Sequence, residues 1–147
     1  MSGSIPVNLP VPTQQDRNLA LLAQGLGLIG YLAGVGQIIC PLVLWYAKRH
    51  DSPYVAFHAL QTAMFHVAVI VALAAVGIVG GVLTLFVVGI FILLIGIPLI
   101  LVGALIFNII GCVSASNGSW SRYPLVGEWA LRTTTGDGAV TAAGARS

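Results

Sequence analysis

The longest hydrophobic stretch of the chain lies between two charged residues, Asp51 and Arg122. Residues 52–121 contain no Asp, Glu, Lys or Arg, which makes 70 consecutive uncharged positions. A helix needs about 20 apolar residues to cross the hydrocarbon core of a bilayer, which is about 30 Å thick. This stretch therefore predicts two long transmembrane helices together with their turn and flanks.

Local signals predict the ends of these two helices. Ser52 is a preferred N-cap residue, and a proline follows it at the favoured first helical position. The first long helix is expected over residues 53 to about 79, and the Gly80-Gly81 pair is expected to end it. The second is expected from residue 82 to about 116, with a kink at Pro98 that a membrane helix tolerates.

A shorter apolar segment, Leu19–Ala47, allows two interpretations. As one helix it would be about 43 Å long. Its centre, Gly34-Val35-Gly36-Gln37, is unfavourable in an unbroken helix. The segment is either one kinked span or a hairpin of two short helices, roughly 16–33 and 37–49. The predicted fold is therefore an all-α integral membrane protein, a bundle of four helices, with three spans as the alternative.

Both ends of the chain differ in composition from the apolar middle. Residues 1–15 hold three prolines and are expected to form an extended N-terminal segment. Residues 16–132 form the predicted transmembrane helical domain. Residues 133–147 are rich in Thr, Gly and Ala and are expected to be a flexible tail.

Composition narrows the class of protein further. Hydrophobic residues make up 58% of the chain and charged residues 7%, whereas soluble domains have about 25% charged residues. A net charge of +2 without a long basic run gives no indication of nucleic acid binding. The two cysteines, Cys40 and Cys112, lie in apolar segments without metal-ligand spacing, and both are expected to be buried.

The basic residues predict the orientation in the membrane. If the first segment spans once, five of the six lie on one side; if it is a hairpin, all six do. Cytoplasmic loops carry an excess of Lys and Arg, so the 48–52 loop and the C-terminus are expected to be cytoplasmic. This rule does not choose between three and four helices.

Glycines recur at helix-packing intervals in the apolar segments. Gly89, Gly96 and Gly103 are seven residues apart, and Gly30 and Gly34 form a second small-residue pair. Small residues in such stripes allow close approach of a neighbouring backbone. The stripes are expected to serve packing within the chain, with self-association as the alternative.

Four polar residues within the apolar segments are candidate functional residues: His58, Gln61, His66 and Asn108. The first three share one face of the first long helix together with Thr62. His66 lies about 20 Å along this helix, near mid-bilayer. It is expected to be a neutral hydrogen-bonded imidazole, with a proton relay or an axial ligand of haem or pigment as alternatives. Asn108 is expected to hydrogen-bond across helices.

Enzyme chemistry has no support in these segments. Asp16, Asp51, Glu128 and Asp137 all lie outside the predicted spans, so no membrane-embedded carboxylate pair exists. No arrangement of nucleophile and base is apparent. The chain is therefore expected to be non-catalytic, and no cofactor is predicted beyond the option at His66.

Two short motifs resemble a bacterial family of small membrane proteins. One includes Ser52, Pro53 and Tyr54 and continues through His58 and Gln61. The other includes Arg122, Tyr123 and Pro124. This family is similar to the channel-forming subunit of the chloroplast inner-envelope import translocon, the Tic-twenty-like proteins. The resemblance implies a four-helix domain in the bacterial inner (cytoplasmic) membrane with both ends on one side.

These observations favour an accessory or structural subunit that packs in a larger membrane complex, with an energy-converting complex as one option. Its expected partners are membrane lipids and other integral membrane subunits or further copies of itself, but not nucleic acid. A transport or translocation component acting as an oligomer is the alternative. Within the fold, His58 and Gln61 are expected to hydrogen-bond to residues 115–125 and so to attach that segment to the first long helix.

Overall fold

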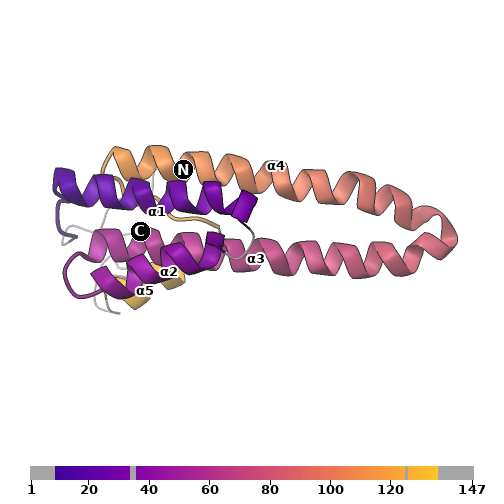
Figure 1. The fold of residues 1–147 in the computed structure, drawn as a ribbon, viewed down its shortest axis with the longest axis horizontal. Coiled ribbons are helices and arrows are strands. Elements are labelled where there is room, and N and C mark those ends of the chain that lie inside the picture. Colours follow the sequence, from indigo (N-terminus) through magenta and orange to yellow (C-terminus); the bar gives the residue numbers. More distant parts are fainter. Residues whose placement is uncertain (1–8, 34–35, 125, 136–147) are drawn as a thin grey trace, which may run out of the picture.

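The computed structural model describes residues 9–33, 36–124 and 126–135, with residues 30–33 described by their helical backbone alone. In this part of the chain all regular structure is helical (Figure 1). The elements are α1 (Gln14–Ala33), α2 (Gly36–Lys48), α3 (Pro53–Leu83), the short 3-10 helix η1 (Thr84–Phe86), α4 (Val88–Ser116) and α5 (Gly127–Thr135).

The longest helices, α3 and α4, form an antiparallel hairpin that sets the length of the molecule (Figure 1). α1 and α2 pack along only one half of this hairpin, and α5 contacts α3 in the same half. We call this half the basal half. The other half, which we call the apical half, consists of α3 and α4 alone and ends at η1.

The first apolar segment forms two helices, so the single kinked helix is wrong and the two-helix alternative is confirmed. α1 and α2 pack against each other, and α2 runs back toward the basal end (Figure 1). At 1.5 Å per residue, α1 is about 30 Å long and α2 about 20 Å. α2 is therefore too short to cross a bilayer core by itself.

α3 begins where the sequence predicts but does not end at the glycine pair. Ser52 has extended backbone angles and its side chain accepts from the backbone N–H of Val55 at 3.4 Å, with Pro53 as the first helical residue. The helix then continues through Gly80 and Gly81 to Leu83. Gly80 permits close contact, because a Cβ there would lie 2.6 Å from a side-chain atom of Leu93 on α4.

The chain reverses direction in a tight turn after α3. The backbone N–H of Val87 donates to the carbonyl of Thr84 at 3.0 Å, and Val87 itself has a φ of 65°. α4 therefore starts at Val88, six residues later than predicted. The Thr84 hydroxyl donates to the Gly80 carbonyl at 2.8 Å.

The glycine stripe of α4 does not act as one surface. Gly89 touches the backbone of α3 and the turn, where a Cβ would overlap Gly80 and Thr84. Gly96 faces Val76 of α3, at 3.1 Å from the position a Cβ would take. Gly103 has nothing within 4 Å of that position. Gly30 lies in α1, and Gly34 lies outside the described residues.

In the apical half, the surfaces of α3 and α4 are apolar and largely uncovered. Both are long and apolar enough to cross a membrane, and their most hydrophobic windows are only 11% and 6% buried within the molecule. The core helix of a soluble protein would be mostly buried instead.

The two cysteines also lie at or near the surface of the molecule. Cys40 is exposed and Cys112 is only partly covered, so the prediction that both are buried is wrong.

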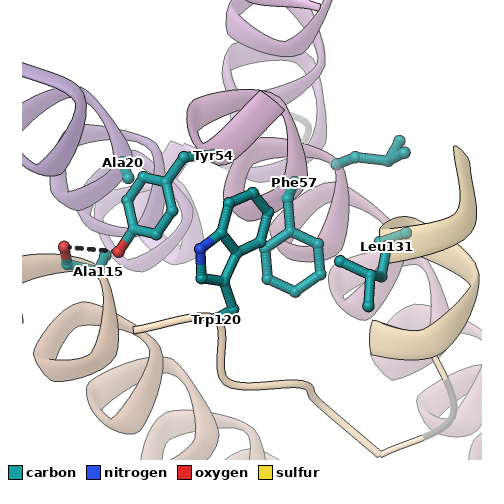
Figure 2. Packing of buried hydrophobic residues seen from close by; sticks show 8 residues of the cluster. Ala20, Tyr54, Phe57, Ala115, Trp120 and Leu131 are labelled. Carbon is teal, nitrogen blue, oxygen red and sulfur yellow. Dashed lines mark hydrogen bonds between the residues drawn. The ribbon is translucent and has the colours of Figure 1, made fainter. Parts of the chain in front are cut away.

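The basal half contains the aromatic core (Figure 2). Trp120, from the loop after α4, packs against Tyr54 and Phe57 of α3 with ring centroids 5.1 and 5.4 Å apart. Ala20 of α1 and Leu131 of α5 also belong to this cluster. α5 itself continues to Thr135, three residues into the predicted flexible tail.

The N-terminus of α1 is capped and attached to the loop before α3. The backbone N–H and hydroxyl of Thr13 both donate to the Asp16 carboxylate, at 2.9 and 2.7 Å. Partial burial raises the pKa of Asp16. Hydrogen bonds from Ser52 and Thr13 and the charge of Lys48 outweigh this, so that the net pKa lies below its usual value of 3.8.

A glycine substitution tests the close approach at the turn. We expect Gly89→Ala to lower the free energy of unfolding by about 3 kcal/mol, because the new methyl group would overlap backbone atoms that have no room to move. Gly103→Ala is the matched control and should change it by less than about 1 kcal/mol. Both are measured by unfolding in detergent micelles, and equal effects would contradict the packing described.

The cap of α1 predicts a pH dependence of stability. A carboxyl whose pKa is lowered by folding stabilises the protein above its unfolded-state pKa, and this contribution is lost as the pH falls through the folded-state pKa. The midpoint temperature of thermal unfolding should therefore fall as the pH is lowered from about 5 to about 2. This fall should be smaller in Asp16→Asn. Asp51→Asn, at an exposed carboxylate of the same end, is the control, and an unchanged profile in Asp16→Asn would refute the role of the cap.

Candidate functional site

A cluster of polar side chains lies inside the apolar basal half. Its members are almost completely buried, between 0% and 1% exposed, and come from three helices: Gln24 of α1; His58, Gln61, Thr62 and His66 of α3; and Asn108 of α4. The four α3 residues share one face of the helix because their spacing follows its period. A polar group in such surroundings is costly unless it is hydrogen-bonded.

Gln24 connects the most groups in this polar cluster. Its side-chain oxygen accepts from the Thr62 hydroxyl at 2.8 Å and from the Tyr123 hydroxyl at 3.0 Å. Its side-chain nitrogen lies 3.3 Å from Nδ1 of His58. One amide therefore links α1, α3 and the segment that follows α4.

The partners of His58 define its tautomer. Nε2 lies 3.1 Å from the carbonyl oxygen of Ser119, which can only accept, so Nε2 carries the proton. Nδ1 then accepts from the amide of Gln24. His58 is thus a neutral imidazole that is buried between α1 and the loop after α4.

Gln61 holds the same loop at a second point. Its nitrogen donates to the carbonyl of Ser121 at 3.2 Å, and its oxygen accepts from the backbone N–H of Tyr123 at 3.0 Å. The side-chain amide of Gln61 thus donates one bond and accepts one, as a backbone peptide group does. The hydrogen bonds expected from His58 and Gln61 to residues 115–125 are both present.

His66 and Asn108 form the apical end of the polar cluster. Nδ1 of His66 donates to the Thr62 carbonyl at 2.8 Å, and Nε2 lies 3.1 Å from the side-chain nitrogen of Asn108. The Asn108 bond joins α3 to α4, as the sequence suggested. Both ring nitrogens of His66 are engaged, so axial ligation of haem or pigment would require loss of the Asn108 bond.

Glycines make room for these bonds. A Cβ on Gly27 would lie 2.7 Å from Thr62 and 2.8 Å from His66. On Gly111 it would overlap the Tyr123 hydroxyl, and on Gly127 it would lie 2.7 Å from Gln61. Neither these glycines nor Gln24 was identified from the sequence. The available signal for Gln24 was the one amide side chain in the apolar part of α1, residues 19–33.

The residues of the two short motifs divide into two groups. Tyr54 and Tyr123 are buried within the protein, at 1% and 4% exposed. The reason is that the loop after α4 folds back under α3. Tyr54 donates there to the Ala115 carbonyl at 3.0 Å (Figure 2). Arg122 and Pro124 are exposed.

Charged and aromatic groups gather on the surface of the basal end. The Arg49 guanidinium lies 4.3 Å from the ring of Tyr46, and Arg122 pairs with Glu128 of α5 at 3.0 Å. Trp129 of α5 is half exposed. Among the described residues, no group of three or more His, Cys, Asp or Glu side chains could hold a metal ion.

Replacing the central glutamine tests whether the polar cluster holds the basal half together. Gln24→Leu keeps the volume but removes the bonds to His58, Thr62 and Tyr123, so we expect a loss of about 2 kcal/mol in unfolding free energy. Gln15→Leu, at an exposed glutamine of the same helix, should stay within about 0.5 kcal/mol. Equal stability of the two variants in detergent unfolding would contradict this role.

The comparisons with known proteins correct the family suggested by the short motifs. The sequence profile of MamF/MmsF, the magnetosome magnetite crystal formation protein family, matches residues 15–130. No curated protein and no solved structure is significantly similar to the chain. The resemblance to Tic-twenty-like proteins was therefore wrong. In this structure the motif residue Ser52 caps α3, and Tyr54 bonds to the C-terminal end of α4. The matched region covers nearly all the described helices, and the chain belongs to the MamF/MmsF magnetosome magnetite crystal formation protein family.

Proposed function

We propose that this chain is a non-catalytic structural or accessory component of the magnetosome membrane. In this role it supports magnetite crystal formation through its packing with lipids and other membrane proteins. Membership in this family supports the magnetosome membrane as the location and magnetite crystal formation as the process. We therefore propose the magnetosome membrane, in place of the energy-converting complex suggested by the sequence, as the location of the protein.

The bonding within the polar cluster carries this proposal. Gln24 and His58 bond α1 to α3, and His58 and Gln61 bond α3 to the loop after α4, so these residues stabilise the basal half. A transport path would instead need polar groups that face water or a substrate. The outer surfaces of α3 and α4 are apolar and uncovered, as required for contact with lipid or with another membrane protein.

Helix lengths and charges support a topology for this role. α3 and α4 cross the bilayer, and the shorter α1–α2 hairpin lies in the basal half of the bundle without adding an exit on the far side. Arg17, Lys48, Arg49, Arg122 and Arg132 then lie at the basal end. The excess of basic residues favours a cytoplasmic location for this end and for the C-terminus.

Complementation in the magnetosome-forming host tests the proposal. Deletion of the chain should change the size or shape of the magnetite crystals seen by electron microscopy. The wild-type chain and Gln15→Leu should restore them, whereas Gln24→Leu should restore them less because its basal half is destabilised. Immunoblots of membranes would show whether each variant accumulates to the same level.

Two further measurements separate a structural role from transport. Purification of the tagged chain in mild detergent should yield a membrane protein partner in fixed stoichiometry. Reconstituted vesicles should show no increase in permeability to Fe²⁺ or protons. Normal crystals in the deletion strain would refute a role in crystal formation, and a clear ion flux would favour transport.

A further inference from the structure

The turn at the apical end of the hairpin is a cap of large apolar side chains. Leu85, Phe86, Val87 and Val88 are 85%, 72%, 61% and 56% exposed. Thr84 carries the one polar side chain of this turn, and its hydroxyl is bonded to the Gly80 carbonyl at 2.8 Å. Residues 84–88, which we call the apical tip, therefore present hydrocarbon to their surroundings.

The apical tip continues the apolar surface of the helices that lead to it. Exposed aliphatic and aromatic residues line both helices below it, including Ile78 and Val82 on α3 and Phe91 and Leu94 on α4. No charged residue interrupts this surface, since residues 52–121 contain none. The loop at the basal end is different, because it carries Lys48, Arg49 and Asp51.

The backbone of the turn is arranged for an apolar environment. The N–H of Thr84 donates to the Gly81 carbonyl, that of Val87 to the Thr84 carbonyl at 3.0 Å, and that of Ile90 to the Val87 carbonyl at 3.1 Å. Lipid offers no hydrogen bonds, so backbone groups at membrane depth must be satisfied within the protein. A short 3-10 turn meets this need better than an open loop.

The length of the hairpin is compatible with a tip in lipid. The apolar surface of α4 from Val88 to Val113 is about 38 Å long, compared with a hydrocarbon core of about 30 Å. An upright hairpin would push the tip into water. A tilt of about 40° brings the two lengths into agreement, at the upper end of the range seen for transmembrane helices.

We propose that the apical tip is a lipid-contacting surface that remains in the far leaflet of the bilayer. The α3–α4 hairpin then crosses the hydrocarbon core without presenting a polar loop to the water beyond. Charged and hydrogen-bonding contacts with soluble partners or mineral are consequently left to the basal end or to other proteins. This proposal does not depend on the role in crystal formation.

Spin labelling of the full chain tests where the tip lies. In a background with Cys40→Ala and Cys112→Ala, single cysteines are introduced by Leu85→Cys at the tip, Leu94→Cys on the side of α4 and Asp51→Cys in the basal loop. Each carries a nitroxide in vesicles of phosphatidylethanolamine and phosphatidylglycerol. Power saturation compares collisions with oxygen, which is concentrated in lipid, and with a water-soluble nickel chelate.

We expect the ratio of oxygen to nickel collisions at residue 85 to match that at residue 94 and to exceed that at residue 51 several-fold. Nickel accessibility at residue 85 equal to that at residue 51 would place the tip in water and overturn the proposal. Exclusion of both reagents from an immobile label would also overturn it, because protein would then cover the tip. Leu85 is almost fully exposed and Leu94 largely so, which makes them matched positions for labelling without loss of packing.

Discussion

The need to hydrogen-bond buried polar groups in an apolar helical protein determines the arrangement of the basal half. Gln24 of α1 meets this need and joins α1 to α3 and to the segment after α4, because its amide bonds to His58, Thr62 and Tyr123. These bonds are directional, whereas contact between aliphatic side chains is not. They therefore fix how α1 and the loop after α4 sit on α3 in a way that hydrophobic contact could not.

The two halves of the molecule consequently differ in what stabilises them. The basal half combines the polar cluster with an aromatic core around Trp120. The apical half relies on close backbone packing, where Gly80 and Gly89 bring α3 and α4 together. Its outer surface is largely uncovered by the other described residues, which suits a surface that faces lipid or another apolar protein.

This division connects the fold with membership in a magnetosome family. The basal end carries the charges and interfacial aromatic groups, and the apical hairpin carries an uncharged apolar surface. A protein organised in this way is anchored in the membrane by the apical half. Charged and aromatic side chains are exposed at the basal end instead, among them Arg49, Arg122 and Trp129.

The sequence by itself determined that the chain is helical and suited to a membrane, because 70 uncharged residues cannot form a soluble surface. It also placed the start of α3 correctly, since Ser52 caps through local bonds. It misplaced the turn, because α3 continues through Gly81 and through Gly80, which packs against Leu93 of α4, and ends only at Leu83. The positions of Tyr54 and Gln24 were decided by the tertiary structure alone, since the bonds that bury them join residues about 60 and up to 99 positions apart.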